Sequence, residues 1–151
     1  MWQFRVNDRL KYWRDFRNHI SELNFISALK ETEELWRTAP FVTYYLDPGD
    51  PNNWPDPWTL LAENYYCDVA KSLGIVYTIY LSGHRSQAED LLLSIEYDQQ
   101  EKYQYNLACF DSGKYILNYW PGEIVNKEQV QKQAMKVLYQ YSSKDLALEK
   151  Y

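Results

Sequence analysis

The sequence predicts an α+β fold, with three N-terminal helices, a four-stranded antiparallel meander and a C-terminal helix in one domain. Three observations lead to this prediction. The length of 151 residues is typical of a single domain. Apolar residues with helical spacing occupy both ends of the chain, and several short apolar runs separated by turn residues follow its midpoint.

Two amphipathic helices are expected at the start of the chain. Over residues 8–23, Trp13, Phe16, Ile20 and Leu23 form one apolar stripe, and Asn7 or Asp8 can cap the helix. The second helix spans residues 27–38, with Ser27 as its N-cap. Pro40 ends it, because the residue before a proline avoids helical geometry.

A loop and a third helix follow an extended apolar segment, residues 41–46, which reads as a strand or a buried strap. Residues 47–57 hold four of the six prolines, and Trp54 indicates that this loop packs against the domain. The third helix is expected over residues 56–73, with Asp56 as N-cap, Pro57 at its first position and Gly74 as its terminator.

Four strand-like runs come next, at residues 75–82, 91–98, 103–111 and 114–120. In the last three runs the odd-numbered positions carry the apolar side chains, and the connections are too short for parallel crossovers. Asn126 and Gln129 resemble a capping box that opens a helix over residues 126–141. Residues 142–151 are expected to be a frayed end of this helix or a tail.

Composition excludes several classes of function. Aromatic residues make up 17% of the chain and the net charge is −5, which argues against binding to nucleic acid or to an anionic membrane. Two cysteines rule out a disulfide-stapled scaffold. No apolar run reaches the ~20 residues of a membrane span, and residues 1–5 do not begin a signal peptide.

No cofactor or metal site is predicted. The only histidines are His19, on the first helix, and His84, in a loop, and neither lies in a cluster with metal-ligand spacing. The five glycines are scattered and form no phosphate-binding loop.

Charge is unevenly distributed along the chain. Residues 41–126 carry four basic and twelve acidic side chains, whereas residues 1–24 form a basic helix. This helix can dock on the acidic face of a neighbouring copy, or it can simply be solvated. The candidate docking residues are Arg5, Arg9, Lys11, Arg14 and Arg17.

Residues 56–120 carry a first family resemblance. A helix ending in Ala70-Lys71-Ser72-Leu73-Gly74-Ile75-Val76-Tyr77, followed by an antiparallel meander, resembles the transglutaminase-like branch of the papain-type thiol enzymes. The resemblance implies a cysteine nucleophile at the N-terminal end of a central helix. It also implies a histidine base on a following strand and an Asp or Asn on the next strand that orients the base.

The residues that match these positions do not form the catalytic set. The nucleophile position falls near Trp58 or Thr59, while Cys67 is expected further along the helix and opposite its apolar stripe. The histidine position falls at residues 105–107, which contain none. Asn118 occupies the orienting position, so we expect a degenerate scaffold without catalytic residues.

Three roles stay open for Cys67, namely a nucleophile, a small packing residue or one half of a bridge to Cys109. If the chain is an enzyme, it is a thiol amidase or peptidase with Cys67, His84 and Asn118 as its candidate catalytic residues.

A second resemblance covers most of the chain. The segments 36–41, 44–47 and Trp54-Pro55-Asp56-Pro57-Trp58, together with Tyr66-Cys67 and Leu73-Gly74, are similar to small virion-associated proteins of T4-like tailed phages, those of cyanophages in particular. This group has no defined activity, so the resemblance implies a setting: a protein made in the host cytoplasm and located in the virion.

The favoured hypothesis is therefore a non-enzymatic structural or assembly component of the tail, baseplate or neck. Its partners would be other virion proteins or copies of itself. Aromatic side chains beyond the needs of the core would form the contacts, although a tyrosine-rich core is the alternative. The candidate interface residues are Phe4, Tyr12, Trp54, Trp58, Trp120, Tyr139 and Tyr141. An inhibitor of a host enzyme would need the same kind of surface.

Overall fold

The two N-terminal apolar stripes form helices where the sequence predicts them. In the computed structural model, which describes residues 1–130 and 134–151, α1 spans Val6–Ser21 and α2 spans Phe25–Arg37. The α2 helix begins earlier than expected because Asn24, not Ser27, is its N-cap and accepts a hydrogen bond from the Ser27 N–H at 2.8 Å. The α1 helix begins before Asn7 and has no side-chain cap.

The predicted helix over residues 56–73 is two helices. Asp56 caps α3 (Pro57–Glu63) as predicted, but this helix ends at Asn64, which adopts a left-handed conformation with φ 57°. The α4 helix (Asp68–Tyr80) follows, so the strand predicted over residues 75–82 is wrong. Nearly every residue of α4 is buried, and a buried helix rich in β-branched residues has the same sequence pattern as a buried strand.

Gly74 lies in the middle of α4 and does not end a helix. A Cβ atom on Gly74 would stand 2.2 Å from Cη2 of Trp36 on α2. The glycine is therefore required by the close approach of the α2 side chain to α4.

The described residues form a four-stranded antiparallel sheet in the order β3-β2-β1-β4. Three strands lie where predicted: β1 (Leu92–Asp98), β2 (Tyr103–Phe110) and a short β3 (Tyr115–Leu117). The fourth is β4 (Met135–Ser142), which pairs with β1 and forms an edge of the sheet. Short 3₁₀ turns occur at Pro51–Asn53, Arg85–Ala88 and Leu148–Lys150.

The helix predicted over residues 126–141 is wrong except for its first turn. The capping box forms, since the side chains of Asn126 and Gln129 each accept the other's backbone N–H. The α5 helix is described only over Lys127–Val130. The rest of the prediction falls on residues 131–133, which lie outside the described residues, and on β4. Tyr139 and Tyr141 alternate along β4, a spacing that suits an edge strand, and the register with β1 shifts between Tyr139 and Val137.

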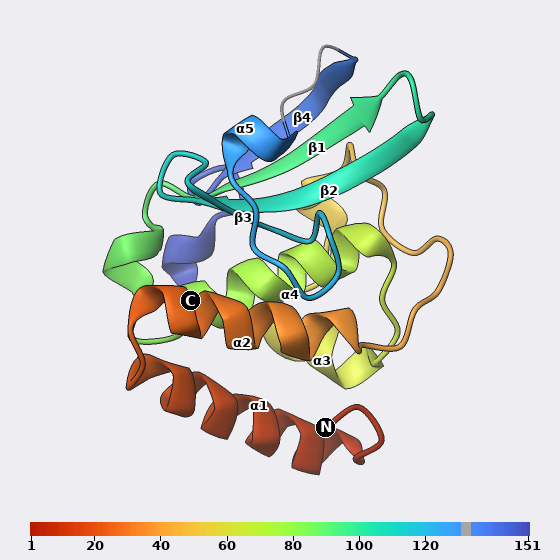
Figure 1. Cartoon of the computed structure of the whole chain (residues 1–151). Coiled ribbons are helices and arrows are strands. Elements are labelled where there is room, and N and C mark those ends of the chain that lie inside the picture. Colours follow the sequence, from red (N-terminus) through yellow and green to blue (C-terminus); the bar gives the residue numbers. More distant parts are fainter. Residues whose placement is uncertain (131–133) are drawn as a thin grey trace.

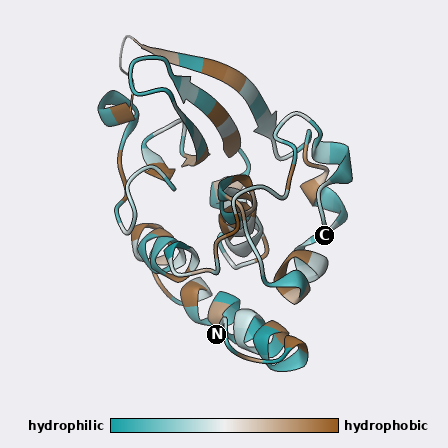
Figure 2. Cartoon of the chain, turned by 90° about the vertical axis from the view of Figure 1, so that its right-hand side faces the viewer, coloured by the Kyte–Doolittle hydropathy of each residue, from teal (hydrophilic) through white to brown (hydrophobic). Residues whose placement is uncertain are grey.

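Helices cover one face of the sheet (Figure 1). The α4 helix lies beneath the strands, α2 lies beside it, and α1 is farthest from the sheet. Seen from the side in Figure 2, α4 runs through the centre of the molecule. A smaller apolar cluster covers the outer face of β2 and β3, so β2 is buried on both faces. This cluster is formed by Leu107, Cys109, Ile116, Tyr119, Val125 and Val130.

The Pro/Trp-rich loop and the C-terminal residues both pack against the domain. Trp54 lies against Tyr141 of β4, with ring centroids 5.4 Å apart, which confirms a packed loop. Residues 142–151, expected to be a frayed helix end or a tail, pack against the domain through Leu148, which is buried, and Tyr151, which packs edge-on against Trp58. Among the described residues, no helix has both the length and the apolar character to cross a membrane.

Candidate functional site

The break between α3 and α4 places Cys67 and Asp68 at the N-terminal end of a buried helix. Cys67 is the N-cap of α4 and Asp68 is its first residue, so the expectation that Cys67 lies far from a helix N-terminus is wrong. The Cys67 side chain is only 4% exposed, belongs to the main core and makes no capping hydrogen bond.

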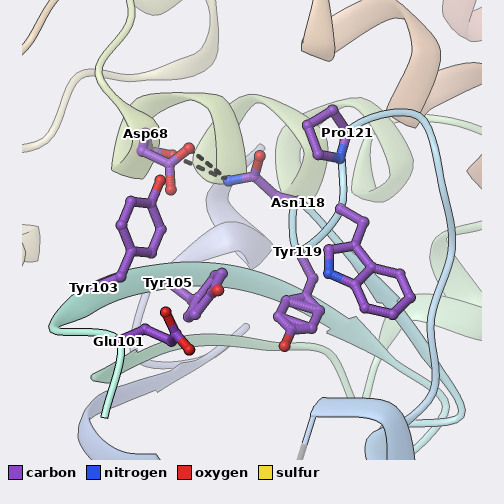
Figure 3. A pocket seen from close by; sticks show the side chains of 8 residues that line it. Asp68, Glu101, Tyr103, Tyr105, Asn118, Tyr119 and Pro121 are labelled. Atoms are coloured by element: carbon purple, nitrogen blue, oxygen red, sulfur yellow. Dashed lines mark hydrogen bonds between the residues drawn. The ribbon is translucent and has the colours of Figure 1, made fainter. Parts of the chain in front are cut away.

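Three polar side chains from three elements meet beside this helix end. The Nδ2 of Asn106, on β2, donates to Oδ2 of Asp68 at 2.8 Å. Asn118 follows β3, and its Nδ2 donates to the Asn106 carbonyl at 2.9 Å and, over 3.4 Å, to Oδ1 of Asp68 (Figure 3). Asn106 and Asn118 stand at the strand positions where the family resemblance implies a base and its orienting partner.

The Asp68 carboxylate is held by amides and has no ion-pair partner among the described residues. Burial raises the pKa of Asp68, while the hydrogen bonds from Asn106 and Asn118 and the nearby charge of Lys71 act in the opposite direction. The Lys71 ammonium lies 5.6 Å from the ring centroid of Phe41. Amides donate hydrogen bonds but neither gain nor lose a proton near neutral pH, so they cannot replace a histidine base.

Glu33 fixes the segment that carries Asn118. Its buried carboxylate, on α2, accepts hydrogen bonds from the backbone N–H groups of Asn118 at 2.7 Å and Gly122 at 3.1 Å. Asn118 has a left-handed backbone with φ 67°, which makes this support important. Burial raises the pKa of Glu33. The sequence analysis missed Glu33. The available signal was its position, four residues after Leu29 and three before Trp36, which places a carboxylate within the apolar stripe of α2.

A cleft of about 480 Å³ opens in front of the Asp68 cluster. It lies where β2 extends beyond the end of β3, and four aromatic side chains and two carboxylates contribute to its walls (Figure 3). Cys67 is not among its lining residues, which are Asp68, Glu101, Tyr103, Tyr105, Asn118, Tyr119, Trp120 and Pro121. Sequence analysis identified only Asn118 and Trp120 among these.

Neither histidine is near Cys67. His84 lies beyond the opposite end of α4, and a helix of 13 residues is about 20 Å long. Its ring nitrogens lie 2.9 Å from the Ile20 carbonyl and 2.9 Å from Oε1 of Gln87. His19 pairs with Glu31 on the surface at 3.1 Å. The structure thus does not bring the candidate set Cys67, His84 and Asn118 together.

The two cysteines are free thiols in different apolar clusters. Cys67 belongs to the main core on the helical side of the sheet, and Cys109 belongs to the smaller cluster on the outer face. Burial raises the pKa of Cys109 to about 12. The described residues contain no group of three or more His, Cys, Asp or Glu side chains arranged to hold a metal ion.

The basic docking residues fall into two groups. Arg9 is 3% exposed and its guanidinium donates to the carbonyls of Leu61 and Ala62, so it ties α1 to α3 and is not available to a partner. Arg17 is partly buried over the Trp13 ring. The remaining three, Arg5, Lys11 and Arg14, are exposed.

The candidate interface aromatics also divide. Trp54 and Tyr141 are partly buried against each other. The other five are exposed, namely Phe4, Tyr12, Trp58, Trp120 and Tyr139.

Solved structures of LapG from Legionella pneumophila share this fold. One has a TM-score of 0.71 and 12% identity over 91% of this chain and 75% of LapG. EGTA-treated LapG gives the same score and identity, and calcium-bound LapG gives 0.71 with 11% identity over 93% of this chain and 78% of LapG. No protein-family model matches the chain, and no curated protein matches it significantly.

At the level of the fold, the similarity to LapG agrees with the transglutaminase-like scaffold expected from residues 56–120. The likeness extends over nearly the whole chain, well beyond the segment that carried the sequence resemblance. At 12% identity it shows the fold alone.

Proposed function

We propose that this chain is a non-catalytic protein-binding component with a transglutaminase-like fold, and that it acts as a structural or assembly protein of a tailed-phage particle. The observation that carries the non-catalytic part is the identity of the side chains at the end of α4. Asn106 and Asn118, which hold the Asp68 carboxylate, stand where the resemblance implies an imidazole and its orienting partner, and Cys67 at this helix end is buried and does not line the cleft.

The surface of the chain supports a role in protein contacts. Tyrosine and tryptophan are enriched at protein interfaces because they combine a large apolar area with a polar group and few rotatable bonds. Trp120 is 43% exposed at the rim of the cleft, and Tyr139 is exposed on the edge strand β4. The virion setting, with other virion proteins or further copies as partners, rests on the resemblance carried by the segments between residues 36 and 74.

A thiol amidase or peptidase is the second candidate, and one observation favours it. Cys67 is the N-cap of α4, and the resemblance implies a cysteine nucleophile at the N-terminal end of a central helix. In this reading Cys67 would attack an amide carbonyl, with His84 recruited as its base. The hydrogen bonds of His84 to Ile20 and Gln87, at the far end of α4, argue against that step.

Mass spectrometry of purified particles, made by the phage that encodes the chain, tests the assembly role. The proposal expects the chain at a fixed copy number per particle, and expects that Cys67→Ala leaves particle yield and infectivity unchanged. Absence of the chain from infectious particles would overturn the assembly role.

Thiol labelling separates the two candidates. Iodoacetamide at neutral pH should modify Cys67 slowly in the folded protein and rapidly after denaturation, with Cys109→Ser isolating the signal. Rapid labelling of the folded protein, together with amide hydrolysis that Cys67→Ala abolishes, would establish the enzyme instead.

A further inference from the structure

The cleft at the end of α4 is walled by a continuous series of aromatic rings. Tyr103 and Tyr105, two residues apart on β2, have ring centroids 4.8 Å apart. Tyr105 meets Tyr119 at 4.6 Å, and Tyr119 stacks on Trp120 at 5.3 Å with an interplanar angle of 15°. These contacts hold four rings together around one opening (Figure 3). Aromatic faces carry a negative quadrupole that attracts cations.

The side chains that line the same cleft carry negative charge and no cation, and Lys71, whose charge acts on Asp68, is not among them. Asp68 and Glu101 are the charged residues among those that line it, and no Lys, Arg or His is in this set. In Figure 3 the Tyr103 hydroxyl points toward Asp68, Glu101 lies beside Tyr105, and Tyr119 lies across the opening from Asp68 and Glu101. A cation that enters would meet the two carboxylates and the aromatic rings in one opening.

The arrangement is fixed before any ligand arrives. Asn106 and Asn118 orient the Asp68 carboxylate through their amide N–H groups, which leaves its charge in place. Glu33 holds the backbone that leads into Tyr119 and Trp120 by its bonds to Asn118 and Gly122. Such support lowers the ordering cost that a ligand would otherwise meet on binding.

We infer that this cleft binds the cationic side chain, lysine or arginine, of a partner polypeptide. The inference deepens the proposed function and rests on it, because it names what the binding component recognises. The ammonium or guanidinium group pairs with Asp68, and the alkyl stem lies along the rings of Tyr103, Tyr105 and Trp120. Charge complementarity and aromatic faces together select a cation over a neutral side chain of the same length.

Binding of small probes, followed by the Trp120 indole N–H signal in NMR spectra, tests the inference. The cationic probes are Nα-acetyl-lysine methylamide and Nα-acetyl-arginine methylamide, and the neutral comparator is Nα,Nε-diacetyl-lysine methylamide. We expect saturable shifts with the cationic probes, whose relative affinities decide between lysine and arginine. Equal shifts with the neutral probe, or no saturable shift, would overturn the inference.

Charge-neutralising variants locate the site. Asp68→Asn keeps a hydrogen-bond acceptor for Asn106 and should weaken the cationic probe about tenfold. Glu101→Gln, at an exposed position, should weaken it several-fold and does not depend on the stability of Asp68→Asn. Asp15→Asn, an exposed carboxylate on α1, is the matched control and should leave affinity unchanged. Unchanged affinity in both cleft variants would refute the assignment.

Two further measurements test the source of the cation. A short lysine-containing peptide should bind more tightly than butylamine, and equal affinity would show that a free amine is the ligand. A dimer that sedimentation detects and that Asp68→Asn dissociates would make a second copy the partner, against a separate polypeptide. The assembly role is tested separately, by the composition of purified particles. If the cationic probes do not bind, this inference is overturned, but the assembly role is not.

Discussion

Replacing Gly74 by alanine should destabilise the protein, against the usual preference of helices. In a helix interior alanine is favoured over glycine by about 1 kcal/mol. At this position the new Cβ would stand 2.2, 2.4 and 2.5 Å from three atoms of the Trp36 ring, where ordinary contact begins at 3.4 Å. The ring would have to retreat by about 1 Å to restore van der Waals contact.

The Trp36 ring has little room to retreat. Its Nε1 donates to Oγ1 of Thr78 at 2.9 Å, and its centroid lies 5.0 Å from that of Trp2 and 5.2 Å from that of Tyr66. Overpacking typically costs about 1–3 kcal/mol, and this site favours the upper end. After subtracting the helix preference, we expect a loss of about 2 kcal/mol, or a Tm lower by about 4–8 °C for a chain of this size.

Urea denaturation followed by far-UV circular dichroism measures this loss. The control is Gly74→Ala in a Trp36→Phe background, where the outer ring atoms are missing and the substitution should cost much less. Stabilisation of the otherwise unchanged protein by Gly74→Ala, or the same cost in both backgrounds, would refute the close-approach argument.

Three further outcomes follow from buried or packed groups. Because burial raises the pKa of Asp68 in the folded state, its carboxylate costs stability increasingly as pH rises from the pKa in the unfolded chain to the pKa in the folded protein. Asp68→Asn should therefore gain stability relative to the wild type as pH rises in urea titrations, and a constant difference would contradict this. Arg9→Ala leaves buried carbonyls unpaired and should cost about 3 kcal/mol in thermal unfolding, whereas exposed Arg5→Ala should stay within about 0.5 kcal/mol. Trp54→Ala should speed proteolysis within residues 47–57 through loss of its contact with Tyr141, and unchanged cleavage would argue against that anchoring.

The parts of the fold with local chemical signals could be predicted from the sequence. Apolar stripes identified α1 and α2, although their predicted N-caps were wrong, and Asp56 and Pro57 identified the start of α3. Turn residues identified β1, β2 and β3. Each of these signals depends only on residues close in sequence, and burial in the folded protein favours the same secondary structure.

The errors arise where tertiary burial decides between two readings of one pattern. No proline or glycine marks the break at Asn64, and the apolar stripe Trp58, Leu61, Tyr65 and Val69 runs across it without interruption. The sequence therefore predicts one long helix, and that error moved Cys67 away from the helix end. The site was predicted in part, since Asn118 and the strand position of Asn106 followed from the resemblance, but Asp68 did not.

The end of α4 explains how one fold position can serve either catalysis or binding. The free N–H groups and dipole of a helix N-terminus stabilise an anion whether it is a thiolate or a carboxylate. A thiolate there is a nucleophile, whereas the Asp68 carboxylate is a fixed charge that two asparagine amides orient without neutralising. Burial raises the pKa of both Asp68 and Glu33, so ionising these carboxyl groups costs the folded state stability. Groups retained at such a cost are typical of functional sites, and a cation bound between Asp68 and Glu101 would recover part of it. A saturating concentration of the cationic probe should therefore raise the Tm of the wild-type protein more than that of Asp68→Asn. An equal rise in both proteins would show that binding of the probe does not depend on the Asp68 carboxylate.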